Sequence, residues 1–160
     1  MKKGLLIAAW LACFFSAQLM AQGSPVFPRG DVATVDNHTG TVWLNELSKP
    51  SDVFDFSVAQ ATFAAGAKLD WHIHPGGQIL MITDGIGYYQ ERGKPVQVVH
   101  KGDILNCTPG VAHWHGAAPG STFSYIAVSP SPKGPTQWLQ RVADEEYRSA
   151  AGAQGKEDGK

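Results

Sequence analysis

The chain has 160 residues, of which 17% are charged and 43% hydrophobic, and its formal net charge at neutral pH is −1. This length suits one ordinary domain with a real hydrophobic core. The near-neutral charge leaves no basic stripe to follow a phosphate backbone, so nucleic acid is excluded as the expected partner.

The first 21 residues have the pattern of a cleaved export signal. Lys2 and Lys3 provide a positive start, residues 5–19 are mostly apolar, and Ala21 ends an acceptable cleavage site. The apolar stretch is too short and too poorly flanked to span a membrane. We therefore expect a bacterial signal peptide at 1–21, a periplasmic or secreted mature chain, and no membrane contact after cleavage.

Residues 22–52 are expected to form a loose N-terminal arm rich in proline and glycine, followed by the first strands. Residues 53–147 continue as short β-like runs separated by glycine- and proline-containing turns. This pattern predicts an all-β fold, an antiparallel sandwich or barrel. The expected strands are 41–44, 54–63, 68–74, 78–83, 87–91, 95–99, 103–107, 112–116 and 122–128.

The C-terminal part of the chain departs from the β pattern. Residues 136–147 fit one amphipathic helix, but they also fit a strand at 138–142 followed by a helical turn that Asp144 opens. The pattern alone does not decide between the two at this length. Residues 148–160 are mainly alanine, glycine, glutamine and charged residues, and we expect a disordered tail there.

Cysteine usage excludes an internal disulfide in an exported chain. Cys13 lies in the signal segment, so Cys107 has no partner after cleavage. Lipidation at Cys13 is an alternative to simple cleavage, although Trp10 fits such a site poorly. Cys107 belongs to an expected strand, where a cysteine is more often a packing residue than a nucleophile.

Three histidines and one glutamine have the spacing of a metal site. His72 and His74 alternate along one expected strand, so their side chains point to the same face. Residues 75–77 (Pro-Gly-Gly) turn the chain, and Gln78 opens the next strand within reach of the same point. His113 would complete the set from a distant segment. Imidazole suits mid-row transition metals and oxygen donors suit manganese, so we expect one divalent ion at these four residues.

These segments resemble the two sequence motifs of the cupin superfamily. In the first motif, Gly-x5-His-x-His-x3-Glu-x6-Gly, Gln78 replaces the usual glutamate, and the matching residues are Gly66, His72, His74 and Gly85. In the second, Gly-x5-Pro-x-Gly-x2-His-x3-Asn, the matching residues are Gly102, Gly110 and His113. The second motif departs at Thr108, where proline is usual, and at Ala117, where asparagine is usual.

Two longer strings, residues 71–78 and 113–117, narrow the resemblance. They are similar to small single-domain bacterial cupins that include manganese-dependent hydroxynitrile lyases. Over residues 53–147 the resemblance implies a double-stranded β-helix, a jelly-roll-like barrel with a short C-terminal helix. It also implies a small-molecule substrate and manganese as the first expected metal, with iron, zinc, nickel and cobalt as alternatives.

Glutamine at position 78 changes the electrostatics of such a site. Three neutral imidazoles and an amide leave the charge of a divalent ion unneutralised. A unit charge about 4 Å away is worth on the order of 4 kcal/mol at an effective dielectric constant near 20. We therefore expect a strong Lewis acid that holds an alkoxide, an enolate or cyanide tightly. The alternative is that Gln78 only hydrogen-bonds a neighbour.

His115 is the candidate catalytic residue. It lies two positions after His113, so on a strand it points to the same face, and imidazole titrates near neutrality. In the hydroxynitrile-lyase-like scheme that the resemblance implies, a cyanohydrin hydroxyl at the metal gives its proton to His115. The carbon–carbon bond then breaks and cyanide departs. A spectator role for His115 carries equal weight.

Two other function classes remain open at this point. A cupin dioxygenase or related oxidoreductase would use the same ligands with a redox-active iron, and a periplasmic binding module would have no turnover. Trp71 and Trp114 alternate with the histidines and face away from the metal, which favours a structural role, for instance at the interface of a homodimer or higher homo-oligomer. His38 is interpreted as a solvated turn residue.

Overall fold

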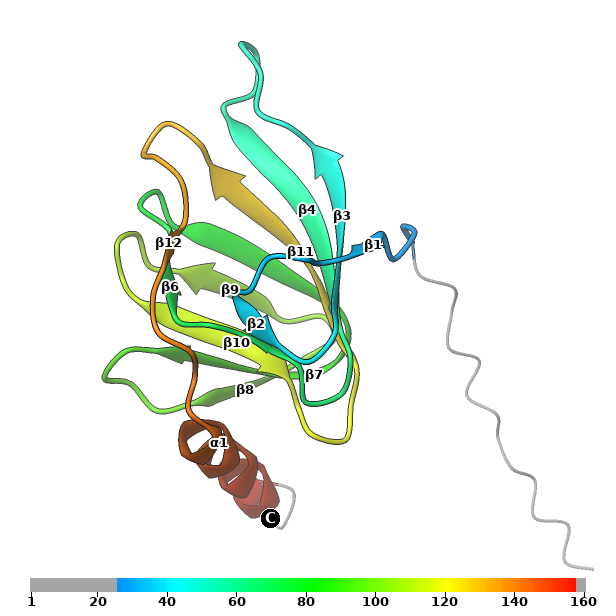
Figure 1. Ribbon diagram of the computed structural model, residues 1–160, viewed down its shortest axis with the longest axis vertical. Helices are drawn as coiled ribbons and strands as arrows, with labels where there is room; N and C mark the ends of the chain where they lie inside the picture. Colours follow the sequence, from blue (N-terminus) through cyan, green and yellow to red (C-terminus); the bar gives the residue numbers. More distant parts are fainter. Residues whose placement is uncertain (1–25, 158–160) are drawn as a thin grey trace, which may run out of the picture.

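An antiparallel β-sheet that curls around a hydrophobic core forms the body of the protein (Figure 1). The computed structural model describes residues 26–157, with side chains described as far as Ala150, so the expected signal peptide lies outside the described residues. The strands and the helix are β1 (Asp31–Val32), β2 (His38–Thr39), β3 (Val42–Ser48), β4 (Phe56–Phe63), β5 (Lys68–Leu69), β6 (His72–Ile73), β7 (Gln78–Glu91), β8 (Gln97–His100), β9 (Ile104–Cys107), β10 (His113–Ala117), β11 (Phe123–Pro130), β12 (Gln137–Trp138) and α1 (Asp144–Glu157).

Two sides of the curled sheet face each other across the core. One side has the order β1-β3-β4-β11-β7-β9, and every neighbouring pair in it is antiparallel. On the other side, β7 pairs with β8 and β10, while β10 also pairs with β5 and β6. The all-β cupin-type barrel with a C-terminal helix, expected from the sequence, is therefore confirmed.

Strand β7 belongs to both sides and corrects one sequence expectation. A turn at Asp84 and Gly85 was expected between two strands, but β7 runs unbroken from Gln78 to Glu91. Its pairing with β11 shifts register there, since Ser124 faces Asp84 whereas Tyr125 faces Ile82. Gly85 has a φ of 76° at this bulge. A β-bulge bends and twists its strand, and here it carries β7 from one side of the barrel to the other.

The core inside the barrel is built by alternate residues of the paired strands. Phe63, Leu80 and Phe123 are each 0% exposed and belong to one cluster with Ala61 and Tyr125. Because side chains alternate along a strand, this settles which face of residues 57–63 looks inward. It is the face that carries Ser57, Ala59, Ala61 and Phe63.

A second cluster lies on the outer side of β10 and contains both tryptophans next to the histidines. Trp71 is 3% exposed and Trp114 is 0% exposed, and they pack in one cluster with Tyr88, Val142 and Ala150. The two rings do face away from the histidines, as expected. They are covered by the chain's own C-terminal segment, which corrects the hypothesis that they form a dimer interface.

The C-terminal segment follows the strand-then-helix alternative in a shorter form. Strand β12 covers only Gln137 and Trp138, and α1 begins at Asp144. Glu146 accepts a hydrogen bond of 2.9 Å from the backbone N–H of Ala143, and the first turn is acidic, which favours a helix N-terminus.

A disordered tail is expected from the sequence at 148–160, but α1 continues through this stretch as far as Glu157, and residues 158–160 lie outside the described residues. Alanine is the strongest helix former, and burial of Ala150 holds this part of α1 against the barrel. Within residues 26–157, no helix combines the length and the apolar character needed to cross a membrane.

Candidate metal centre

The three motif histidines meet at one end of the barrel because β6 and β10 are neighbours. His72 begins β6 and His113 begins β10, and these two residues are register partners in the antiparallel pair. Their ring centroids are 4.4 Å apart, and the ring of His74 lies 5.1 Å from His72 and 5.5 Å from His113. Sheet pairing thus brings His113 next to His72 and His74, although it lies at least 39 positions further along the chain.

The nitrogen atoms of this group are close enough for one ion. One ring nitrogen from each of His72, His74 and His113 lies within 4.8 Å of the others. Two nitrogens that bind one zinc-sized ion at about 2.1 Å are separated by about 4 Å or less. Small side-chain rotations would bring the ring nitrogens from their present separation of up to 4.8 Å to that distance. The group could therefore hold a divalent metal.

Hydrogen bonds at the far nitrogen of two rings direct the near nitrogen into the group. Nδ1 of His72 lies 2.8 Å from the carbonyl oxygen of Asp70, and Nδ1 of His113 lies 3.1 Å from that of Val111. A carbonyl only accepts, so Nδ1–H donates in both rings and Nε2 keeps its lone pair. Both Nε2 atoms are buried without a hydrogen-bond partner in the described chain. Such orphaned lone pairs fit a bound cation.

Gln78 offers an oxygen to the same end of the barrel. Its amide nitrogen donates a hydrogen bond of 3.0 Å to the Ser129 hydroxyl, while Oε1 is buried and lacks a partner among the described residues. The bond to Ser129 therefore orients the amide and leaves the oxygen available. The hydrogen bond to a neighbour, considered from the sequence as the alternative, is present, and Gln78 as a metal ligand stays a prediction.

Burial keeps the histidines neutral, which is the state that binds a metal. The pKa of His74 is lowered to about 4, first by burial and then by the proximity of His113. The pKa of His72 is lowered well below its ordinary value by burial and by His113. The pKa of His113 is also lowered by burial, and the nearby Glu91 opposes that effect.

Glu91 is a charged neighbour that the sequence did not reveal. It is the register partner of His113 on the adjacent strand β7 and is 5% exposed. Its pKa is lowered to about 2, first by Lys94 and then by Thr108, whose hydroxyl donates a hydrogen bond of 2.7 Å. One carboxylate is thus the cross-strand neighbour of a histidine of the group. No local pattern predicts this contact, because it arises from strand pairing.

His115 lies beside the three-histidine group and outside it. Its ring centroid is 5.1 Å from that of His72 and 5.8 Å from that of His113. It is 1% exposed, and neither ring nitrogen has a hydrogen-bond partner in residues 26–157. Burial, followed by His72 and His113, lowers its pKa well below the ordinary value. It is a neutral imidazole with free polar atoms at a cavity.

A cavity of about 240 Å³ lies beside the three-histidine group. His74, Gln78 and His115 line its polar end, whereas Ala59, Ala61, Phe63 and Ala127 supply apolar walls. Trp138 and Leu44 also line it and are 42% and 49% exposed. His38, interpreted from the sequence as a solvated turn residue, is half-buried in β2 and lines the same cavity. The cavity suits a small organic molecule with an apolar substituent.

The fold and these histidines define a cupin, and comparison with known proteins agrees. Residues 59–129 match the family model for the cupin domain. The (R)-mandelonitrile lyase of Granulicella tundricola is 40% identical over 114 residues, which cover 71% of this chain and 87% of that protein. The chain belongs to the cupin family and is similar to small bacterial members that include hydroxynitrile lyases.

Solved structures support the same assignment. A cupin-like protein from Thermotoga maritima superimposes with a TM-score of 0.77 at 45% identity, over 79% of this chain and 97% of that one. The polyketide cyclase RemF from Streptomyces resistomycificus reaches a TM-score of 0.60 at 15% identity, over 79% of this chain and 92% of that chain. The second likeness concerns the fold alone.

Proposed function

We propose that the protein is a metal-dependent lyase that cleaves small hydroxynitriles into an aldehyde or ketone and hydrogen cyanide, and catalyses the reverse addition. The observation that carries this proposal is a set of buried polar atoms without a hydrogen-bond partner among residues 26–157. Oε1 of Gln78 and both nitrogens of His115 lie at the cavity, and Nε2 of His72 and Nε2 of His113 lie in the adjacent histidine group. The 40% identity to a protein named (R)-mandelonitrile lyase supports the same reaction class.

The residues of the proposed site have two roles, metal binding and proton transfer. His72, His74, Gln78 and His113 would hold a divalent cation, which supplies Lewis-acid stabilisation of negative charge. His115 accepts the proton of the substrate hydroxyl, the bond between the carbinol carbon and the nitrile carbon breaks, and the electron pair leaves with cyanide. His115 then returns the proton, so that the products are a carbonyl compound and HCN. The apolar walls hold the organic substituent and exclude water.

Elemental analysis of the purified protein tests the metal centre first. We expect about one equivalent of a divalent transition metal, with manganese as the first candidate. His113→Ala should lose most of it, because His113 supplies one of the three grouped nitrogens. A parent protein that retains no metal after exposure to manganese, iron or zinc would refute the proposal.

A turnover assay tests the reaction. Cyanide release from mandelonitrile should depend on the metal, and His115→Ala should reduce kcat by about 10²-fold or more, the usual contribution of a general base, while the metal stays bound. Oxygen uptake during turnover would indicate a dioxygenase. Retained ligand binding without turnover in the parent protein would indicate a binding module.

We also propose that the mature protein is exported. The proposal is based on the charged start and apolar stretch of residues 1–21. The N-terminal sequence of protein isolated from the periplasm or the medium should begin at Gln22. Recovery of the full chain from the cytoplasm would contradict export.

A further inference from the structure

A C-terminal segment, residues 136–141, lies against residues 71–74, which include His72 and His74, and we call it the strap. Its strand β12 pairs with β6, so that Trp138 faces His72. The backbone N–H of Leu139 donates to the carbonyl of Trp71 at 2.8 Å, and the N–H of Trp71 donates to Gln140 at 3.0 Å. These bonds hold the strap along residues 71–73, and Figure 1 shows β12 running beside β6.

Side chains of the strap touch two of the grouped histidines. The Thr136 hydroxyl lies 3.1 Å from Nδ1 of His74. The Trp138 ring packs on His72 with centroids 4.9 Å apart. The strap is therefore part of the wall of the metal centre as well as of the cavity.

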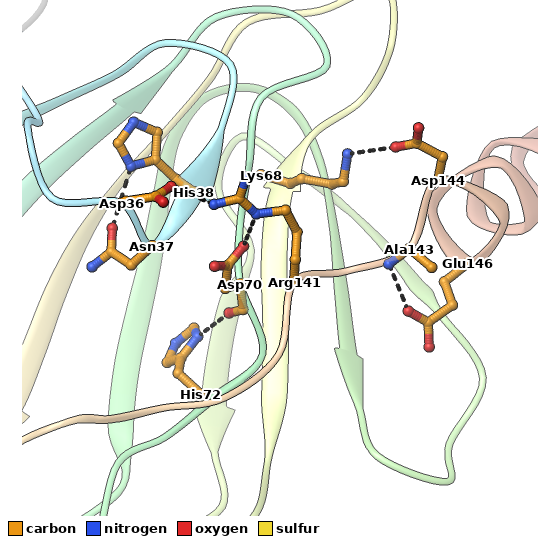
Figure 2. Close-up of polar contacts among 10 residues, drawn as sticks. All are labelled: Asp36, Asn37, His38, Lys68, Asp70, His72, Arg141, Ala143, Asp144 and Glu146. Carbon is orange, nitrogen blue, oxygen red and sulfur yellow. Dashed lines mark hydrogen bonds and ion pairs between the residues drawn. The ribbon is translucent and has the colours of Figure 1, made fainter.

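The far end of the strap is fixed by ion pairs. The Arg141 guanidinium bridges Asp36 and Asp70, with 3.3 Å between its Nε and Asp70 Oδ1. Figure 2 shows Arg141 between the two carboxylates, and the carbonyl oxygen of the same Asp70 accepts from His72. Asp70 therefore both anchors Arg141 through its side chain and orients the His72 ring through its backbone carbonyl.

The three grouped histidines differ in what holds their Nδ1 atoms. Backbone carbonyls hold His72 and His113, and no side-chain substitution removes those partners. His74 is held instead by a side chain, that of Thr136, which lies 62 positions further along the chain. It is also the least buried of the three, so its ring has more freedom to turn. The orientation of His74 therefore depends on the strap.

We propose that Thr136 is a positioning residue of the metal centre. Its hydroxyl oxygen accepts a hydrogen bond from Nδ1–H of His74, which keeps that proton on Nδ1 and directs Nε2 toward His72 and His113. The inference rests on the proposed metal centre and adds to it a residue outside both cupin motifs. A hydrogen-bonding partner of this kind typically changes metal affinity by about 10–100-fold.

Thr136→Val tests this inference, since valine keeps the shape of threonine and removes the hydroxyl. We expect the dissociation constants for Mn²⁺ and Zn²⁺, measured by competition with a chelator, to rise about 10–100-fold. Thr136→Ser should restore most of the affinity, because serine keeps the hydroxyl. In ¹⁵N NMR spectra of the metal-free protein, His74 should show the Nδ1–H form in the parent and in Thr136→Ser, and a mixture of forms in Thr136→Val.

Thr122→Val is the matched control. Thr122 is exposed and precedes β11 at the end opposite to Ser129, so this change should leave the dissociation constants unchanged. An unchanged metal affinity in Thr136→Val would overturn the role of Thr136 alone. Metal binding without lyase activity in the parent would overturn the proposed reaction and leave the role of Thr136 intact. A parent protein that binds neither metal would overturn both.

Discussion

At the residue scale, Gln78 is uncharged at the position where a carboxylate would change the charge of the proposed metal centre. The grouped side chains are uncharged at neutral pH, because burial lowers the pKa values of His72, His74 and His113 and an amide carries no charge. Glu91 lies behind His113 but is already engaged by Lys94 and Thr108. A carboxylate at position 78 would be the first anionic group to face the cavity directly beside His74.

Gln78→Glu should therefore strengthen metal binding and weaken anion binding. The added charge attracts the cation and offsets its pull on cyanide. The Ser129 hydroxyl, which accepts from the Gln78 amide in the parent, can rotate to donate to the new carboxylate. The carboxylate and an ion about 4 Å away interact by on the order of a few kcal/mol, which predicts a rise in metal affinity and a fall in anion affinity of tenfold or more each. Chelator competition measures the first change, and inhibition by azide measures the second.

Gln97→Glu supplies the control for this charge effect. Gln97 is exposed on β8, so the same substitution there should change neither quantity. Anion inhibition that is equally strong in Gln78→Glu and in the parent would contradict the idea that the amide leaves the metal charge unneutralised.

At the element scale, local patterns located most strands but not the points where the chain bends between sheets. Alternation and turn residues predicted β4, β9 and β10 closely, because each of them pairs over its whole length. The turn predicted at Asp84 and Gly85 is wrong, because an aspartate–glycine pair is typical both of a turn and of a bulge. Only the register against β11 distinguishes the two.

Some residues of the candidate site could likewise be predicted from local spacing, and others could not. His72, His74 and Gln78 were predictable because they lie within seven consecutive residues with a periodicity of two. Thr136, Ser129 and Glu91 reach the site only through tertiary contacts between strands. Their positions in the sequence carry no metal-ligand spacing, so no local signal could have identified them.

Gly85→Ala should be among the most destabilising small substitutions in the barrel. The residue has a positive φ, and an added Cβ would overlap the backbone carbonyl oxygen of Thr122. We expect a loss of about 3 kcal/mol or more in the free energy of unfolding, of which the left-handed conformation accounts for about 1–2 kcal/mol. Urea unfolding followed by tryptophan fluorescence measures it.

Gly93→Ala separates strain from overlap. Gly93 has a similar φ of 81°, but nothing lies within 4 Å of a Cβ added there. It should cost only the conformational term of about 1–2 kcal/mol. Equal losses in the two variants would show that the close approach of β7 to the turn before β11 does not constrain the bulge.

At the scale of the whole molecule, the barrel gathers four histidines beside one cavity, three of them buried and His74 half-buried, and keeps them neutral. Their pKa values are all lowered, first by burial in each case. The ordinary value of 6.5 describes the unfolded chain, while His74 falls to about 4 in the fold. Between these values the unfolded state binds protons that the native state does not bind. The free energy of unfolding must therefore fall as the pH falls through this window.

The metal-free protein should accordingly lose stability steeply from pH 7 to pH 5. Each such histidine contributes up to about 1.4 kcal/mol per pH unit. Urea unfolding at several pH values measures the slope, and keeping the pH above 5 avoids Glu91, whose carboxylate stabilises the fold above about pH 4.5 and stops doing so only as the pH falls toward 2. His115→Leu should reduce the slope, because it removes one of these groups. A stability that does not change between pH 7 and pH 5 would mean that the unfolded chain binds no more protons than the barrel does.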